Sequence, residues 1–545
     1  MNMKILNASE YGITPEKDIT IELINLIDEV KKIAGEKTVV FNTGIYYIDS
    51  EKCNKYMLYI TNTVGDNEFS ENETPHLNAV PFYLNGVDNL TVDGNDSIFI
   101  IDGKVTNIAV ENCNSITLKN LEIRHTHPDM HELKVKKVAP FFVDFQIDSD
   151  TQYYFNNGKP FFYGKDYCEA ADKNAIHASW IGLIRKNTPN RIKRVLHPLN
   201  GAVKMVDLKN GCIRVYYTNT FRFKSGDCFY IYDVRRQFAG IFINQSKNVA
   251  VQNIKQCFNY SLALVLQDCE NVTVDSVQFA PEQNSARKMA SAADFMQICM
   301  CRGKVSITNS IFDGAGDDCM NVHGVHFSIK SVNKDKMTVA FMHPQSHGYQ
   351  PIHIGDEIAF INHKTLLQYG KATVKSARML NEYEIELILD SEGNAIAGDA
   401  IEDISACPDV YFANNTLNRI ITRGLLLTTR GKVVIENNHF ISNSMSGILL
   451  SDDANNWYES GMCCDVTIQN NIFDYCGETP VLIKPENIIH AGAVHKNISI
   501  KNNVFMNYKG YCICAKSTDT IQMKGNKYNS DKIIKSKNCS NIVLE

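Results

Sequence analysis

The chain has 545 residues, 44% of them hydrophobic and 21% charged, and its formal net charge is −6. This composition excludes a disordered chain and is sufficient for a large buried core. Without a basic excess there is no electrostatic support for a nucleic-acid partner, and no run of about eighteen apolar residues is present to span a membrane.

The amino-terminal residues and the cysteines give an expectation for the compartment. The segment from Met1 to Asn7 already contains polar residues and does not resemble a secretory signal peptide. Seventeen cysteines are spread through strand-like runs, which favours buried free thiols over a disulfide framework. We therefore expect a cytoplasmic protein, or a secreted one if a leader has been removed.

The first predicted element is a helix over Ile19 to Ala34, where Leu23, Leu26, Ile27 and Val30 share one apolar face. We expect this helix to cap one end of the fold, because an exposed sheet edge must be covered. The segment 38–48 follows and reads as strand, turn and strand. Beyond it the chain consists of short β-rich pieces that recur.

The recurring pieces have a V-x-I-x-N-like core, as in VVIENNHF from Val433 and VTIQNNIF from Val466. Steps of 23 residues separate the fifth positions 253 and 276, 414 and 437, and 502 and 525. Such a step is typical of one coil of a right-handed parallel β-helix. The asparagine at the fifth position is expected to stack into an internal ladder. An evenly spaced β-sandwich is the alternative, and the fixed phase argues against it.

Two steps, of 133 residues from 120 to 253 and of 105 residues from 309 to 414, are too long for one coil. Each is expected to hold a small antiparallel β-barrel that walls a pocket, with simple packing or homodimer formation as the alternative role. The sequence thus predicts an all-β chain whose parts are listed here: a cap helix and first coils over 1–124, a barrel-like insertion over 125–240, coils over 241–325, a second barrel-like insertion over 326–405 and final coils over 406–545.

Three acidic residues are the candidate catalytic groups. Asp294 lies in SAADFMQIC, and Asp317 and Asp318 lie in GAGDDCMNVHG. Aligning the two segments places Asp294 beside Asp318 on adjacent coils, about 4.8 Å apart. Crowded carboxylates raise at least one pKa, as a general acid requires. By strand alternation, either the bend falls at 317–318 or only one aspartate of the pair faces the substrate.

Other polar residues near strand ends are candidates for substrate binding. They are expected to line a sugar pocket beside the acids, and they are Asn321, His323, Arg287, Arg423, Arg430, Trp457 and Glu459. The alternative roles are solvated surface arginines, a capped-turn histidine and a core tryptophan. No cysteine pair has the spacing of a zinc site, so we expect no metal.

These motifs together resemble a known family. GAGDDCMNVHG, AADFMQICMCRGKV and ILLSDDANNWYESGMCCDVTIQNNIF are similar to segments of glycoside hydrolase family 110, over roughly residues 248–505. The resemblance implies an inverting, metal-independent and cofactor-free α-1,3-galactosidase that removes terminal galactose from blood-group-B-like or linear glycans. It implies Asp294 as the proton donor and Asp317 or Asp318 as the base.

Two alternatives remain open at this stage. One is another β-helix polysaccharide hydrolase of the polygalacturonase type, and the other is a non-catalytic glycan-binding β-helix. Adjacent coils place carboxylates about 5 Å apart, which by itself suits an enzyme that retains the anomeric configuration of the sugar. The expectation that the configuration is inverted therefore comes from the family resemblance.

Overall fold

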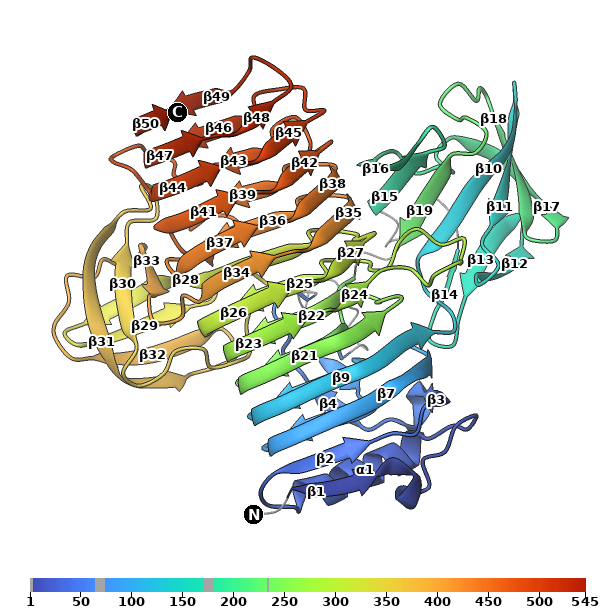
Figure 1. Cartoon of the computed structure of the whole chain (residues 1–545), viewed down its shortest axis with the longest axis horizontal. Coiled ribbons are helices and arrows are strands. Elements are labelled where there is room, and N and C mark those ends of the chain that lie inside the picture. The colour runs from blue at the N-terminus through green and yellow to red at the C-terminus, as the bar shows by residue number, and fades with distance from the viewer. Residues whose placement is uncertain (1–2, 64–73, 171–179, 233–234) are drawn as a thin grey trace.

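The computed structural model describes residues 3–63, 74–170, 180–232 and 235–545. The chain forms a stack of parallel β-coils from which two modules project (Figure 1). The predicted all-β fold with a parallel β-helix is confirmed.

Each coil contributes strands to three parallel ladders. The first ladder contains β1 (Lys4–Asn7), β2 (Lys37–Val40), β7 (Asp88–Asp102), β9 (Asn114–His125), β21 (Lys247–Gln256), β23 (Glu270–Asp275), β26 (Arg302–Thr308), β34 (Asp409–Ala413), β37 (Lys432–Glu436), β41 (Asp465–Gln469), β44 (His495–Lys501), β47 (Thr518–Lys524) and β50 (Ser540–Leu544). The second contains β3 (Ile45–Asp49), later parts of β7, β9 and β21, and β24 (Gln278–Phe279), β27 (Ile311–Asp313), β35 (Thr416–Ile420), β38 (His439–Asn443), β42 (Ile472–Asp474), β45 (Val504–Met506) and β48 (Lys527–Tyr528). The third contains β6 (Phe82–Asn85), β8 (Ile108–Glu111), β20 (Ala239–Asn244), β22 (Leu262–Gln267), β25 (Met296–Cys299), β28 (Met320–Asn333), β36 (Leu425–Thr428), β39 (Ile448–Leu450), β43 (Val481–Ile483), β46 (Ile513–Lys516) and β49 (Ile534–Lys537).

Asparagines form a buried ladder, but one position later than the sequence predicts. Asn437 and Asn470, at the fifth position, have a left-handed backbone with φ of 57° and form the bend. The following residues stack inside: the backbone N–H and the side-chain amide of Asn438 both donate to Asn471 Oδ1 at 2.9 Å. The same bonds link Asn471 to Asn503. The fifth residue therefore forms the bend, and the side chain of the sixth accepts a hydrogen bond from the buried backbone N–H of the preceding coil.

The amino-terminal helix α1 spans Thr20–Lys31, shorter at both ends than predicted. Its buried residues Leu23, Leu26 and Val30 lie in the same core cluster as Phe82 and Leu84 of β6 in the first coils. Two short 3₁₀ turns, at Ala8–Tyr11 and Ser50–Lys52, and the strand pair β4 (Lys55–Met57) and β5 (Leu77–Ala79) complete this end. In the described ranges, no helix is long and apolar enough to cross a bilayer.

The first insertion leaves the coils after β9 and returns at β20. Its larger antiparallel sheet has the order β16 (Thr188–Arg194), β15 (Trp180–Arg185), β19 (Cys228–Tyr232), β10 (His131–Ala139), β11 (Phe142–Ile147), β18 (Cys212–Tyr217) and β17 (Ala202–Lys209). A smaller sheet contains β12 (Gln152–Asn156), β13 (Lys159–Tyr163) and β14 (Cys168–Ala170). Among the described residues the larger sheet is open, with β16 and β17 at its edges, so it is not closed by hydrogen bonds as a barrel is.

The second insertion is a closed six-stranded antiparallel barrel. Around the barrel the strands are β28, β29 (Lys336–Ala340), β32 (Glu384–Leu389), β31 (Gln368–Met379), β30 (Glu357–Ile361) and β33 (Ala400–Asp403), which pairs again with β28. The first half of β28 belongs to a coil and its second half to the barrel. One uninterrupted strand therefore joins the β-helix to this module.

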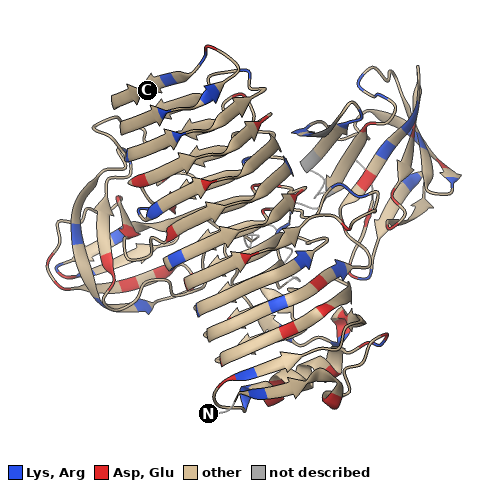
Figure 2. Ribbon diagram, viewed as in Figure 1, with Lys and Arg blue, Asp and Glu red and all other residues tan. Residues whose placement is uncertain are grey.

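Figure 1 shows the two insertions projecting on opposite sides of the stack of coils. Figure 2 shows Lys, Arg, Asp and Glu interspersed along the visible coils, with neither sign dominating. All seventeen cysteines are free thiols, as predicted.

Candidate active site

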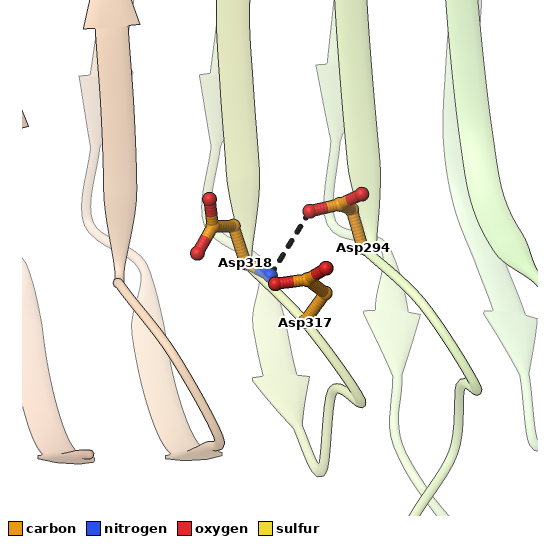
Figure 3. Close-up of side chains that lie close together, drawn as sticks. All are labelled: Asp294, Asp317 and Asp318. Carbon is orange, nitrogen blue, oxygen red and sulfur yellow. Dashed lines mark hydrogen bonds between the residues drawn. The ribbon is translucent and has the colours of Figure 1, made fainter. Parts of the chain in front are cut away.

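The three predicted acids meet at the ends of two neighbouring coils (Figure 3). Strand β25 pairs with β28 so that Met296 lies beside Met320 and Ile298 beside Val322, the register that the sequence alignment predicts. Strand β28 begins only at Met320, so both aspartates of the pair lie in the preceding bend and both face the same pocket. This resolves the alternation question in favour of a bend at 317–318.

Asp294 is buried and held in place by donors from two directions. The backbone N–H of Asp318 donates to its Oδ1 at 2.9 Å, and the side-chain amide of Asn62 donates to its Oδ2 at 3.0 Å. Burial, reinforced by the negative charge of Asp317, raises the pKa of Asp294 well above its usual range. This carboxyl group is therefore suited to hold a proton near neutral pH.

Asp317 has the opposite electrostatic environment. Its carboxylate is ion-paired with Arg236, and the guanidinium of Arg194 lies 4.0 Å away. Burial alone would raise the pKa of Asp317, but the positive charges of Arg236, Arg423 and Arg194 together lower it below its usual value. Asp317 is therefore an ionised carboxylate beside a protonated one.

Asp318 is held by the coil that follows it. The register of β28 with β36 places Arg423 directly beside Asp318. Arg423 Nε donates to Oδ1 and its terminal nitrogen lies near Oδ2, both at 2.9 Å, while the Thr422 hydroxyl also donates to Oδ1. This bidentate contact fixes Asp318, and through its N–H also Asp294.

The acid cluster has the geometry of a cation site but already has positive partners. Single oxygens of Asp294, Asp317 and Asp318 lie within 4.8 Å of one another. Arg236 supplies positive charge at Asp317, and Arg423 does so at both oxygens of Asp318. The donor set therefore fits an arginine-balanced acid cluster better than a metal centre.

The acids open into a pocket of about 480 Å³, within the usual size range for small ligands. Four of the predicted binding residues line it: Asn321, Arg423, Trp457 and Glu459. Asn321 donates to Glu459 at 2.8 Å, and Glu459 lies in β40 (Glu459–Ser460), which pairs with β28 at Gly324 and Val325. Trp457 is 52% exposed, which identifies it as a pocket wall and not a core anchor.

The apolar part of this wall comes from successive coils. In the third ladder Asn321 pairs with Leu426, and Leu426 with Leu449 on the next coil. Both leucines also line the pocket. The Trp457 ring stacks on His343 of the barrel module, with centroids 4.5 Å apart, and the backbone N–H of Trp457 donates to Asp453 Oδ2 at 2.8 Å. The pocket thus combines polar groups around the acids with an apolar plate beyond them.

Three predicted binding residues lie outside the pocket lining, which corrects their expected placement. His323 is only 4% exposed and lies two residues after Asn321 in β28, where its Nδ1 bonds the Gly324 carbonyl at 2.7 Å. Burial would lower the pKa of His323, but Cys299, Glu459 and that carbonyl raise it to about 10.

Arg287 and Arg430 form ion pairs that join the coils to the two insertions. Arg287 is buried against Asp150 of the first insertion, at 2.8 Å. Arg430 pairs with Glu402 of the second, at 2.7 Å. Arg430 lies near a strand end as expected, two residues after β36, whereas Arg287 lies in the long connection between β24 and β25. The partners of both are insertion carboxylates that the coil pattern does not reveal.

Sequence reasoning missed Asn62, Arg236 and Arg194, which all come from outside the recognised coils. Asn62 precedes β5, and its backbone N–H donates to the Gln345 carbonyl of the barrel module at 2.7 Å. Arg236 lies on the segment that returns from the first insertion. The Arg235–Arg236 doublet just before a coil strand was the one available signal for it.

Comparison with known proteins agrees with this architecture. The family model for the GLAA-B beta-barrel domain II matches residues 336–401, within the second insertion, and that for a right-handed β-helix region matches residues 391–528. Alpha-1,3-galactosidase A of Bacteroides thetaiotaomicron is 33% identical over 552 residues, covering 98% of this chain and 95% of the relative. The enzyme of the same name from Bacteroides fragilis is 32% identical, covering 95% and 86%, and alpha-1,3-galactosidase B of Phocaeicola vulgatus is 28% identical, covering 96% and 87%.

Proposed function

Because the chain belongs to the α-1,3-galactosidase A and B family, glycoside hydrolase family 110, we propose that it is an exo-acting, inverting α-1,3-galactosidase. Its substrates are glycans that end in α-1,3-linked galactose, either blood-group-B-like or linear. The observation that carries the proposal is the opposite electrostatic environment of Asp294 and Asp317 within one pocket.

The chemistry follows from this difference. Asp294, protonated, donates its proton to the glycosidic oxygen as the bond from that oxygen to the galactose C1 breaks. Asp317, ionised, takes a proton from the water whose oxygen attacks C1. Asp318, fixed by Arg423, orients Asp294 through its backbone N–H. The galactose ring lies with its apolar face toward Trp457, Leu426 and Leu449.

The spacing of the carboxyl groups bears on whether the anomeric configuration of galactose is inverted or retained. The nearest carboxylate oxygens lie within 4.8 Å, whereas the carboxyl groups of inverting enzymes are generally about 6.5–9.5 Å apart. Figure 3 shows Asp318 pointing toward the following coil, away from Asp294, but the base assigned above is Asp317, so this direction does not widen the space between acid and base. The expectation of inversion therefore comes from the family and not from this spacing. Proton NMR of the first-formed sugar is expected to show β-galactose, and α-galactose appearing first would overturn inversion.

The pocket charge argues against a polygalacturonase. Its lining carries six carboxyl groups, of Asp294, Asp317, Asp318, Asp453, Glu459 and Glu486, and two guanidinium groups, of Arg236 and Arg423. A negative lining disfavours a negatively charged galacturonate chain. A non-catalytic glycan-binding protein, in turn, has no need of a protonated carboxyl group beside an ionised one.

One panel tests the function. The protein and its Asp294→Asn variant are incubated with Galα1-3Gal, its fucosylated form, the α-1,4 and α-1,6 isomers, and polygalacturonate. We expect galactose release from α-1,3-linked substrates by the unmodified protein alone. Release of galacturonate, or no release from any α-galactoside, would refute the proposal.

A further inference from the structure

A second pocket, of about 310 Å³, lies on the coils that precede the acids. Its lining includes Lys104, Asp129, Asp166, Gln237, Phe238 and Tyr260. None of these residues takes part in the chemistry described above, so the pocket calls for a separate explanation.

The strand register places this pocket on the same edge of the β-helix as the acids. Along the third ladder Met296 lies beside Leu264, Leu264 beside Ile241, Ile241 beside Ile108, and Ile108 beside Phe82. Counting back two residues, the positions equivalent to Asp294 are Leu262, Ala239, Thr106 and Val80. The pocket residues Tyr260, Phe238, Lys104 and Ala79 come one or two positions before these. The pocket therefore occupies the same bend on the four preceding coils.

Coil spacing gives the distance between the two pockets. Neighbouring coils are about 4.8 Å apart, so this second pocket extends from about 5 to about 19 Å beyond the coil of Asp294. The two pockets also share a wall, because Arg235 lines the second pocket and the next residue, Arg236, lines the pocket of the acids. A chain of sugars leaving the acids along this edge would meet the second pocket.

The proton donor indicates the direction in which that chain leaves. Asp294 lies on the amino-terminal side of Asp317 and Asp318, and it must face the glycosidic oxygen. The remainder of the acid pocket extends the other way, to Leu449 and Trp457. The galactose is therefore retained on the carboxy-terminal side, and the sugar that departs lies on the side of the second pocket.

The chemistry of the second pocket suits a neutral polyhydroxyl chain. Lys104 Nζ pairs with Asp129 at 2.6 Å, and the Lys104 N–H donates to Asp166 at 2.6 Å. Ser50 also donates to Asp166, at 3.2 Å. The whole lining carries three carboxyl groups and three basic groups, so its formal charge balances: Glu51, Asp129 and Asp166 against Lys55, Lys104 and Arg235. Tyr260 adds an aromatic ring 5.6 Å from Lys104 Nζ. Asp129 and Asp166 belong to the first insertion, which thereby forms the outer wall.

We propose that this second pocket, the acceptor pocket, binds the neutral sugars that lie beyond the residue directly attached to the galactose. The proposal rests on the proposed function for the position of the galactose. It assigns to the first insertion a role in recognising the glycan that carries the galactose.

Binding is tested first, without hydrolysis. The Asp294→Asn variant is titrated calorimetrically with the neutral tetrasaccharide lacto-N-neotetraose and, in parallel, with methyl β-galactoside. Adding Gln237→Ala and Lys55→Ala, at two side chains of the acceptor pocket, is expected to weaken tetrasaccharide binding roughly tenfold and to leave the monosaccharide unaffected. Gln522→Ala, exposed on a distant carboxy-terminal coil, is the matched control. Equal tetrasaccharide affinity with and without the two pocket substitutions would overturn the proposal.

Kinetics provide the second test. We expect kcat/KM to be higher for the tetrasaccharide extended by α-1,3-galactose than for Galα1-3Gal, and the Gln237→Ala/Lys55→Ala variant to lose this preference while keeping disaccharide activity. An equal fall on both substrates at an unchanged thermal melt would contradict an acceptor pocket. Absence of hydrolysis by the unmodified protein would refute the proposed function, and the titration would still decide whether the pocket binds the tetrasaccharide.

Discussion

Replacing Arg236 by glutamine tests whether this arginine keeps Asp317 ionised beside the protonated Asp294. The guanidinium is ion-paired with Asp317 and lies 3.4 Å from Asp294 Oδ2. Both partners are largely buried, so solvent screens the interaction little. The substitution removes one positive charge and leaves Arg423 and Arg194 near Asp317.

The size of the effect follows from the loss of one close charge. An opposite charge within hydrogen-bond distance lowers a carboxyl pKa by about 1–3 units, and two arginines remain. We therefore expect the pKa of Asp317 to rise by about 1–2 units, equivalent to about 1.4–2.7 kcal/mol. A base must be ionised to work, so the acidic limb of the variant's pH profile is expected to lie at higher pH than that of the unmodified protein. At pH values on this limb, the variant should be about ten- to a hundredfold slower than the unmodified protein.

The assay is the pH profile of kcat/KM with α-galactosyl fluoride, whose leaving group needs little protonation, so that the acidic limb reports the base. Arg194→Gln is the matched control, because the Arg194 side chain is 41% exposed and its guanidinium lies 4.0 Å from Asp317, so the acidic limb of this variant should move far less. A folded Arg236→Gln protein with an unshifted acidic limb would refute the assignment of Asp317 as the base.

Three further outcomes are expected. Asp294→Asn should reduce hydrolysis of Galα1-3Gal by about 10²–10⁴-fold and that of α-galactosyl fluoride much less; equal losses in the two assays would argue against a proton donor. Asn471→Ala should lower stability by about 2–3 kcal/mol in denaturant unfolding, because it leaves the buried N–H of Asn438 without an acceptor. Asn470→Gly, at a left-handed bend position, should be nearly neutral, and similar costs for both would contradict the inner ladder. Dialysis against EDTA should leave galactose release unchanged, and recovery of lost activity by added metal would show that the arginines do not suffice.

The coil repeat and the acid cluster could be predicted because both are local patterns that recur in register. The alignment of Asp294 with Asp318 needs only the strand period and the coil step, and β25 and β28 have this register. The inner asparagine ladder was placed one position early, because Asn437 and Asn438 are identical residues. Only the backbone shows which of them turns the chain.

The rest of the site depends on contacts between segments far apart in the chain. Asn62 and Arg236 reach Asp294 from the amino-terminal loop and from the return of the first insertion. Arg287 and Arg430 were expected at the pocket because the sequence repeat indicated strand ends of the same coil stack for both, but Arg287 lies in the long connection between β24 and β25. Their carboxylate partners belong to the insertions, and no coil repeat predicts how an inserted module docks.

Both insertions enter and leave the coils through strands paired with each other, β10 with β19 and β28 with β33. Strands β26 and β34 are neighbours although Lys304 and Asp409 are 105 residues apart. Closing such a flexible loop costs about 1.3 kcal/mol more than closing one of 23 residues. Once a module has formed from its own nearer contacts, its two ends already lie side by side. The next coil then joins the stack at nearly the entropic cost of an uninterrupted repeat.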